Sequence, residues 1–169
     1  MKKLTTYLWI APIFVLIQIL LLNNIQFISY INPLVYLVLI ITLPQDTEKW
    51  FIILYAFFIG ILLDIFEGNM GLNSSSLVFI AFITPYLHKV LIPKNSIDER
   101  DKLNLYVLGL KTFSVYAFSI IFIHHTFLFA LENFSSNDII FLLFKILLSS
   151  IITFIIILIF QLFTFKVKE

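Results

Sequence analysis

Long apolar runs, separated by short polar breaks, dominate this chain of 169 residues. Hydrophobic residues make up 61% of it and charged residues only 12%, whereas a soluble domain carries about 25% charged residues. A lipid bilayer offers no hydrogen-bond partners to the backbone, so runs of about 20 apolar residues cross it as helices. The sequence therefore predicts an all-α, polytopic membrane protein.

The apolar runs predict a single transmembrane domain over residues 1–169, with six helical spans. We expect these spans at about residues 4–22, 27–43, 50–66, 72–92, 103–131 and 138–165. Asn32-Pro33 interrupts the second span and Pro44 ends it, which predicts a broken or re-entrant element covered by protein. The fifth span would be about 43 Å long against a hydrocarbon core of about 30 Å, so it either tilts or bends near Gly109.

The positive charges predict the orientation of the bundle. With the N-terminus inside, the inner segments carry nine basic residues: Lys2, Lys3, Lys49, Lys89, Lys94, Arg100, Lys102, Lys166 and Lys168. The predicted outer segments, residues 23–32, 64–71 and 132–138, carry none. Because cytoplasmic loops are enriched in Lys and Arg, both termini are expected in the cytoplasm.

Several kinds of chemistry are not expected from this composition. Without cysteine the chain forms no disulfide and no thiolate metal site. The net charge of +1 argues against a nucleic-acid partner. The three histidines show no metal-binding spacing, and no serine–histidine–acid or paired-carboxylate pattern occurs. We therefore predict no metal, no cofactor and no enzymatic activity.

Asp64 is the first candidate site residue, because a carboxylate beside the bilayer core is costly without a partner. Ala56, Gly60 and Asp64 follow one another at four-residue intervals, a pattern of small residues that lets a second helix approach closely. The next helix is expected to begin with Asn73 or Ser74 as its N-cap. Asp64 would accept hydrogen bonds from the first N–H groups of that helix and hold the hairpin together. The alternative is that its carboxylate only marks the water interface.

A second candidate site consists of His124, His125 and Lys145. By depth these three residues could meet Asp64 in a buried polar cluster that holds the bundle together or lines a cavity. The alternative is that Lys145 extends to the outer surface and one histidine faces a neighbouring helix. Adjacent histidines point about 100° apart on a helix, so the pair is a poor metal site.

Residues 60–66, 71–76 and 81–85 resemble the MreD family of rod shape-determining membrane proteins. That family has about six spans and a Gly-x-x-x-Asp step at the end of the third span, followed by a glycine. This chain carries Gly60 and Asp64 in that step, although it has Thr84-Pro85 where many relatives have Arg-Pro. The residues expected to fix the hairpin or contact a partner are Gly60, Asp64, Gly68, Gly71, Asn73 and Pro85.

The resemblance implies a non-catalytic scaffold of the cell-wall elongation complex in the bacterial cytoplasmic membrane. Its implied partners are membrane lipid, the bitopic protein MreC, the MreB filament, and the elongation glycosyltransferase and transpeptidase. It also implies a six-helix fold like that of the substrate-binding subunits of energy-coupling factor transporters. The alternative function is such a subunit, binding a small solute among Asp64, His124, His125 and Lys145. A membrane enzyme is a weaker third option.

Overall fold

The structure is a computed structural model, and it describes residues 2–23, 31–69, 71–93, 98, 101–133 and 138–164. Within these residues every regular element is helical. In chain order they are α1 (Lys2–Ile17), the π-helical turn η1 (Gln18–Leu22), the 3₁₀ turn η2 (Val35–Leu37), α2 (Val38–Ile41), α3 (Lys49–Glu67), α4 (Leu72–Leu91), α5 (Leu105–Glu132) and α6 (Ile139–Thr164).

Four described helices are long and apolar enough to cross a membrane: Lys49–Glu67, Leu72–Leu91, Leu105–Glu132 and Ile139–Phe163. The stretch Thr6–Leu22 forms a further apolar helix that is shorter. The predictions of an all-α chain and of membrane-spanning helices are confirmed at this level. The count of six spans stays a prediction.

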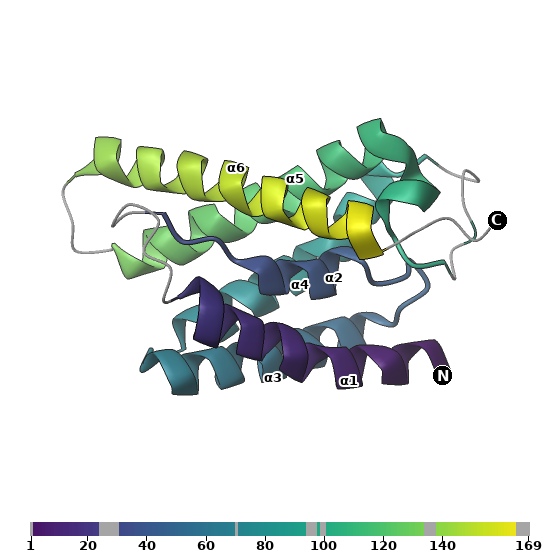
Figure 1. Cartoon of the computed structure of the whole chain (residues 1–169), viewed down its shortest axis with the longest axis horizontal. Coiled ribbons are helices and arrows are strands. Elements are labelled where there is room, and N and C mark those ends of the chain that lie inside the picture. Colours follow the sequence, from purple (N-terminus) through teal and green to yellow (C-terminus); the bar gives the residue numbers. More distant parts are fainter. Residues whose placement is uncertain are drawn as a thin grey trace.

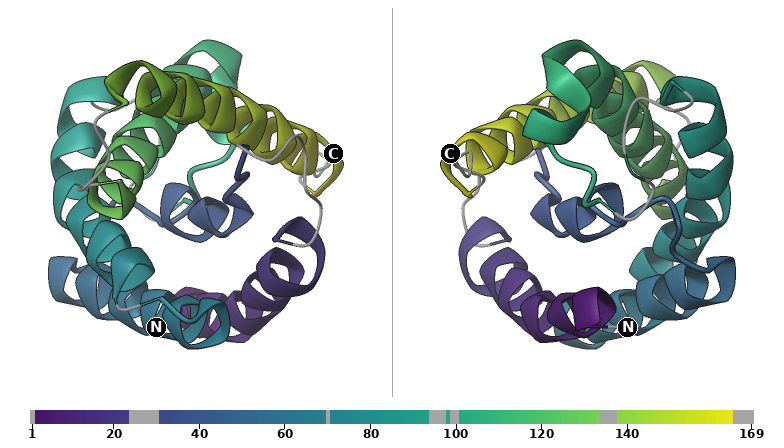
Figure 2. Two further views of the ribbon diagram at one scale, coloured as in Figure 1. Left: turned by 90° about the vertical axis from the view of Figure 1, so that its left-hand side faces the viewer. Right: turned by 90° about the vertical axis from the view of Figure 1, so that its right-hand side faces the viewer.

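The longer helices surround the short central helix. Seen end-on, α1, α3, α4, α5 and α6 form a ring around η2 and α2 (Figure 2). From α3 to α6, each helix packs beside the next one in the sequence. Between α1 and α6, the rings of Phe14 and Phe160 meet edge to face, with their centroids 5.1 Å apart. The start of α1 and the end of α6 lie at the same end of the bundle (Figure 1).

The second predicted span differs from the expectation. Of residues 27–43, only 35–41 are helical in the described part of the chain, and residues 27–30 lie outside it. Asn32-Pro33 keeps the approach non-helical, because proline disfavours the helical region for the residue before it and supplies no N–H. Every residue from Leu34 to Ile41 is buried, so this short helix has no face for lipid.

The non-helical backbone before η2 obtains its hydrogen bonds from side chains. The Gln18 amide donates to the carbonyl of Pro33 (2.9 Å) and accepts from the N–H of Val35 (2.9 Å). Two hydroxyls of α6 accept the remaining N–H groups: Ser149 Oγ from Asn32 (3.1 Å) and Thr153 Oγ1 from Leu34 (3.0 Å). Irregular backbone at membrane depth is tolerated only when neighbouring groups satisfy it in this way.

Tyrosine hydroxyls satisfy the other end of the central helix. Tyr7 of α1 donates to the carbonyl of Thr42 (2.6 Å), and Tyr116 of α5 donates to the carbonyl of Ile41 (3.2 Å). The last carbonyls of a helix have no partner within that helix. The surrounding elements therefore provide hydrogen bonds at both ends of the segment that η2 and α2 form.

Helix α5 bends at Gly109, which is one of the two possibilities that its length predicted. Gly109 has φ 72° and ψ 158°, a backbone conformation outside the helical region. Non-glycine residues rarely adopt such a positive φ. The predicted bend near Gly109 is therefore confirmed, and it separates the first turn of α5 from the long apolar part that follows.

Candidate functional site: the α3–α4 hairpin and the cavity beside it

Asp64 holds the start of α4. Its Oδ1 accepts a hydrogen bond from the N–H of Asn73 (2.9 Å), and its Oδ2 accepts one from the N–H of Ser74 (3.0 Å). The carboxylate is buried, and a negative charge at the positive end of a helix is favoured. The predicted hydrogen bonds between Asp64 and the first N–H groups of the next helix are therefore present.

The predicted N-cap of this helix was wrong. Gly71, not Asn73 or Ser74, precedes the first helical residue, and it has φ 85° and ψ 14°. Gly71 has no side chain with which to cap the helix, and the carboxylate of Asp64 from α3 takes that role. Asn73 and Ser74 lie inside the first turn and supply the N–H groups.

At Gly60 the backbones of α3 and α4 approach each other very closely. A Cβ added there would lie 2.2 Å from the Cα and 2.7 Å from the backbone nitrogen of Ser74. Ala56, one turn earlier, is fully buried. The small residues at four-residue intervals therefore do what the pattern predicted, because they let the two backbones come together.

Two residues that were predicted to fix the hairpin or contact a partner, Gly68 and Pro85, lie in different parts of the fold. Gly68 ends α3 in the left-handed conformation (φ 70°), and its N–H bonds back to the carbonyl of Asp64. Pro85 lies inside α4, about 20 Å along the helix from Gly71. Its neighbour Thr84 is buried and donates to the carbonyl of Ile80 (2.8 Å). Pro85 therefore belongs to the body of α4 and not to the hairpin.

Replacing Asp64 by asparagine is expected to lower the free energy of unfolding by about 1–3 kcal/mol. The amide offers one acceptor oxygen, so one of the two N–H groups of α4 would face an NH₂ group instead. A thermal melt in detergent, read by size-exclusion chromatography, measures the change. Asp138→Asn is the matched control, because Asp138 accepts from the N–H of Phe141 at an exposed helix start, where asparagine caps equally well. Equal melting temperatures for the two variants would contradict this role of Asp64.

The predicted cluster of Asp64 with the histidines does not form. His125 bonds to the carbonyl of Ile121 (2.8 Å) and to the hydroxyl of Thr153 (3.3 Å), within α5 and towards α6. His124 is fully buried, and its two ring nitrogens have no hydrogen-bond partner within the described residues. Both oxygens of Asp64 already accept backbone N–H groups of α4. The histidines are therefore core residues between α5 and its neighbours.

Tyr36 of η2 links His124 to the hairpin. The two rings meet edge to face at 5.8 Å, and the Tyr36 hydroxyl donates to Oδ1 of Asn73 (3.3 Å). The contact between His124 and α4 thus runs through the central element of the bundle, and the sequence pattern gave no sign of it.

Lys145 forms an ion pair that the sequence analysis did not name. Its ammonium lies 2.8 Å from the Glu132 carboxylate and 4.4 Å from the centre of the Phe129 ring. The Lys145 side chain is only 11% exposed, and its ammonium reaches the partly exposed carboxylate of Glu132 at the end of α5. It bridges α6 to the end of α5.

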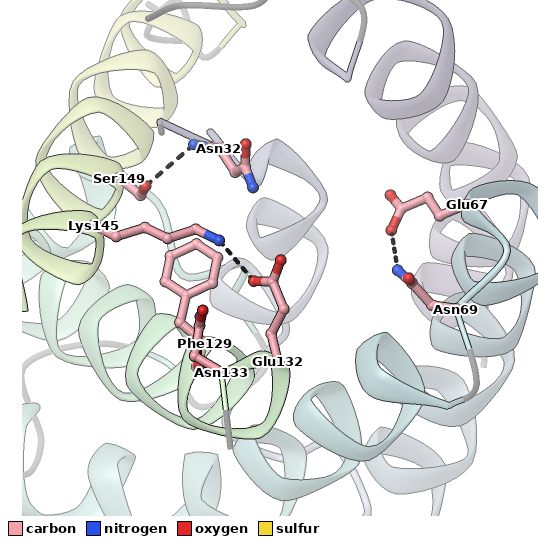
Figure 3. Close-up of polar contacts among 8 residues, drawn as sticks. All are labelled: Asn32, Glu67, Asn69, Phe129, Glu132, Asn133, Lys145 and Ser149. Carbon is pink, nitrogen blue, oxygen red and sulfur yellow. Dashed lines mark hydrogen bonds and ion pairs between the residues drawn. The ribbon is translucent and has the colours of Figure 1, made fainter. Parts of the chain in front are cut away.

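A cavity of about 260 Å³ lies where α3 and α5 end and α4 begins. Its lining residues come from five parts of the chain: Asn23, Asn32, Leu34, Glu67, Asn69, Leu72, Asn73, Leu128, Phe129 and Glu132. In Figure 3, Glu67 and Asn69 stand on one wall, and Glu132 with Lys145 stands on the opposite wall. The cavity therefore has polar groups on two facing sides.

Glu67 is held in place by three asparagine amides. Its Oε1 accepts from Asn23 Nδ2 (2.7 Å), and its Oε2 accepts from Nδ2 of Asn69 (2.9 Å) and of Asn73 (2.6 Å). The sequence analysis did not place Glu67 in a site. The sequence does show asparagines at the ends of several apolar runs. It does not show that they meet at one carboxylate, which happens only when the end of η1, the end of α3 and the start of α4 come together.

The fold and the cavity define a class of protein. In the described part of the chain, four helices are long and apolar enough to cross a membrane, which makes this a multi-pass helical membrane protein with a polar cavity at one end of its bundle. Within the described residues, no group of three or more His, Cys, Asp or Glu side chains could hold a metal ion. Comparisons with protein-family models, curated proteins and solved structures found no match to this chain.

Proposed function

We propose that this protein is a membrane scaffold of the MreD type in the bacterial cytoplasmic membrane. It would bind MreC and help control cell shape and peptidoglycan synthesis, with MreB and the elongation glycosyltransferase and transpeptidase in the same complex. Six spans with both termini in the cytoplasm are part of this proposal. The scaffold performs no chemistry of its own.

The observation that carries the proposal is the use of the motif residues in the structure. Gly60, Asp64 and Gly71 carry the resemblance, and all three build the α3–α4 hairpin: Gly60 by its closeness to Ser74, Asp64 by its hydrogen bonds and Gly71 by its positive φ. These are packing roles. A motif used to fix a bundle supports a scaffold more than a catalyst.

The scaffold would meet MreC through apolar helix surfaces. Trp9 and Ile13 on α1, Leu20 on η1, and Ile65 and Phe66 on α3 are all at least half exposed. In a membrane, helices associate through close packing and hydrogen bonds and not through exclusion of water. A rigid hairpin keeps such a surface in one shape, which favours binding of the transmembrane helix of MreC.

A pull-down from native membranes tests the proposal. We expect the tagged chain, extracted in mild detergent, to recover MreC and the cell-wall elongation enzymes, identified by mass spectrometry. A tagged polytopic protein of the same abundance serves as the control. Recovery of an ATPase pair with a coupling membrane protein, or recovery of neither set of proteins, would refute the scaffold.

A second function is favoured by one observation, the polar cavity. A substrate-binding subunit of an energy-coupling factor type transporter needs such a space for a small solute. The cavity is lined by Glu67 and asparagines, and not by the Asp64, His124, His125 and Lys145 set expected from the sequence. An ATPase pair in the pull-down would support this function.

A further inference from the structure

We propose that the cavity between Glu67 and Glu132 binds a primary ammonium group. This inference goes beyond the scaffold function and does not depend on it. The cavity, of about 260 Å³, is far larger than a site for a single ion, since by the same measure one water molecule needs only about 10–15 Å³. It has room for one small solute or one lipid headgroup.

The charge of the cavity selects a cation. Two carboxylates, Glu67 and Glu132, face the space, and one ammonium, that of Lys145, pairs with Glu132. This count leaves one negative charge. The three hydrogen-bond partners of Glu67 are neutral amides, and within the described residues it has no ion-pair partner. A neutral solute would leave this charge unbalanced, and an anion would be repelled.

The orientation of the amides selects a hydrogen-bonding cation over a metal ion. Nδ2 of Asn23 and of Asn73 points to Glu67, and their oxygens accept from Gln18 (2.9 Å) and Tyr36 (3.3 Å) instead. Calcium needs six to eight oxygen ligands, and magnesium needs an octahedral set. An ammonium group needs only a few acceptors, because it carries three N–H donors. Glu67 has a lone pair left for it, since a carboxylate offers about four acceptor sites and three are used.

The position of the cavity suits two sources of the ammonium group. It lies at the ends of helices that are long enough to cross a membrane, where lipid headgroups and water meet. The group can therefore belong to an ethanolamine headgroup of a lipid or to a free amine in solution. Both would bind through the same salt bridge to Glu67, with one hydrogen bond to its remaining lone pair.

The test uses the full chain in nanodiscs and two lipids with the same acyl chains. Phosphatidylethanolamine carries a primary ammonium, whereas the methylated ammonium of phosphatidylcholine has no N–H to donate. Native mass spectrometry counts the lipid retained after release from the disc. We expect the wild-type chain to retain phosphatidylethanolamine about tenfold more than phosphatidylcholine, the discrimination of one charged hydrogen bond. This comparison needs no variant.

Variants then locate the site. Glu67→Gln keeps the size and an acceptor oxygen but removes the charge, and we expect it to abolish the preference. Asp138→Asn is the matched control, because it removes one carboxylate near the start of α6 outside the cavity lining. It should keep the preference. A preference that survives in Glu67→Gln would overturn the assignment to this cavity.

Free ethanolamine in phosphatidylcholine discs distinguishes the sources. A rise in melting temperature that requires Glu67, with no retained phosphatidylethanolamine, supports a soluble amine. Retained phosphatidylethanolamine supports a headgroup. If the wild-type chain neither distinguishes the two lipids nor responds to ethanolamine, the proposal is wrong, whatever the pull-down shows about the scaffold.

Discussion

Replacing Gly60 by alanine is expected to lower the free energy of unfolding by at least about 3 kcal/mol, the upper range for overpacking a core. The new methyl would lie 2.2 Å from the Cα of Ser74, and this obstacle is backbone that no rotamer change can move. To accept it, α3 and α4 must separate. That separation pulls the N–H groups of Asn73 and Ser74 away from Asp64, so the packing and the hydrogen bonds are lost together.

Two variants distinguish a backbone collision from a general intolerance of alanine. Gly68→Ala adds the same methyl where no atom lies within 4 Å, so its cost is limited to about 1–2 kcal/mol for the positive φ. Removing the Ser74 side chain in Gly60→Ala/Ser74→Gly should not restore stability, because the nearest atoms are backbone. Melting temperatures in detergent measure all three. Rescue by Ser74→Gly, or equal losses for the two glycines, would contradict the predicted collision.

The sequence predicted the parts of the fold that depend on local chemistry. Apolar runs placed α3, α4, α5 and α6 within about two residues of their ends, because lipid allows few other structures. The four-residue spacing of Gly60 and Asp64 predicted the close hairpin, since residues at that interval share one helix face. Gly109 marked the bend of α5 for a similar reason, because only glycine readily adopts its φ.

The parts that were missed depend on residues far apart in the chain. Glu67 becomes a site only when Asn23, which follows the π-helical turn η1, reaches it from 44 residues away. Lys145 was expected near Asp64 or the surface, but it pairs with Glu132 because α5 and α6 are adjacent antiparallel helices. Depth in the membrane could be estimated from the sequence. The rotation of α5 and α6 about their axes could not, because apolar residues lie on all faces of these two helices.

The central helix α2 shows this limit most clearly. Pro33 before it and its shortness predicted a broken element, yet nothing local identified the groups that would satisfy the backbone leading into it. Gln18 does so from 17 residues away, at the start of the π-helical turn η1. A glutamine in an apolar run predicts an unusual contact. Only the folded chain shows that the partner is main chain.

Replacing Gln18 by leucine is expected to lower the free energy of unfolding by about 2–5 kcal/mol, because it leaves two buried backbone groups without partners. These groups are the carbonyl of Pro33 and the N–H of Val35. Leucine fills nearly the same space, so the loss reports the hydrogen bonds and not a void. Water cannot replace the amide, since Gln18 is only 1% exposed.

Gln161→Leu is the matched control for this effect. Gln161 of α6 is also fully buried, but within the described residues neither its Oε1 nor its Nε2 has a hydrogen-bond partner. Replacing an unsatisfied buried amide by an apolar group of similar size is neutral or stabilising. The two substitutions are chemically identical, so they should shift the melting temperature in detergent in different ways: strongly downward at residue 18, unchanged or upward at residue 161. Equal losses at both positions would show that the two glutamines matter only as polar residues in a helix, and the role of Gln18 in supporting the α2 segment would be wrong.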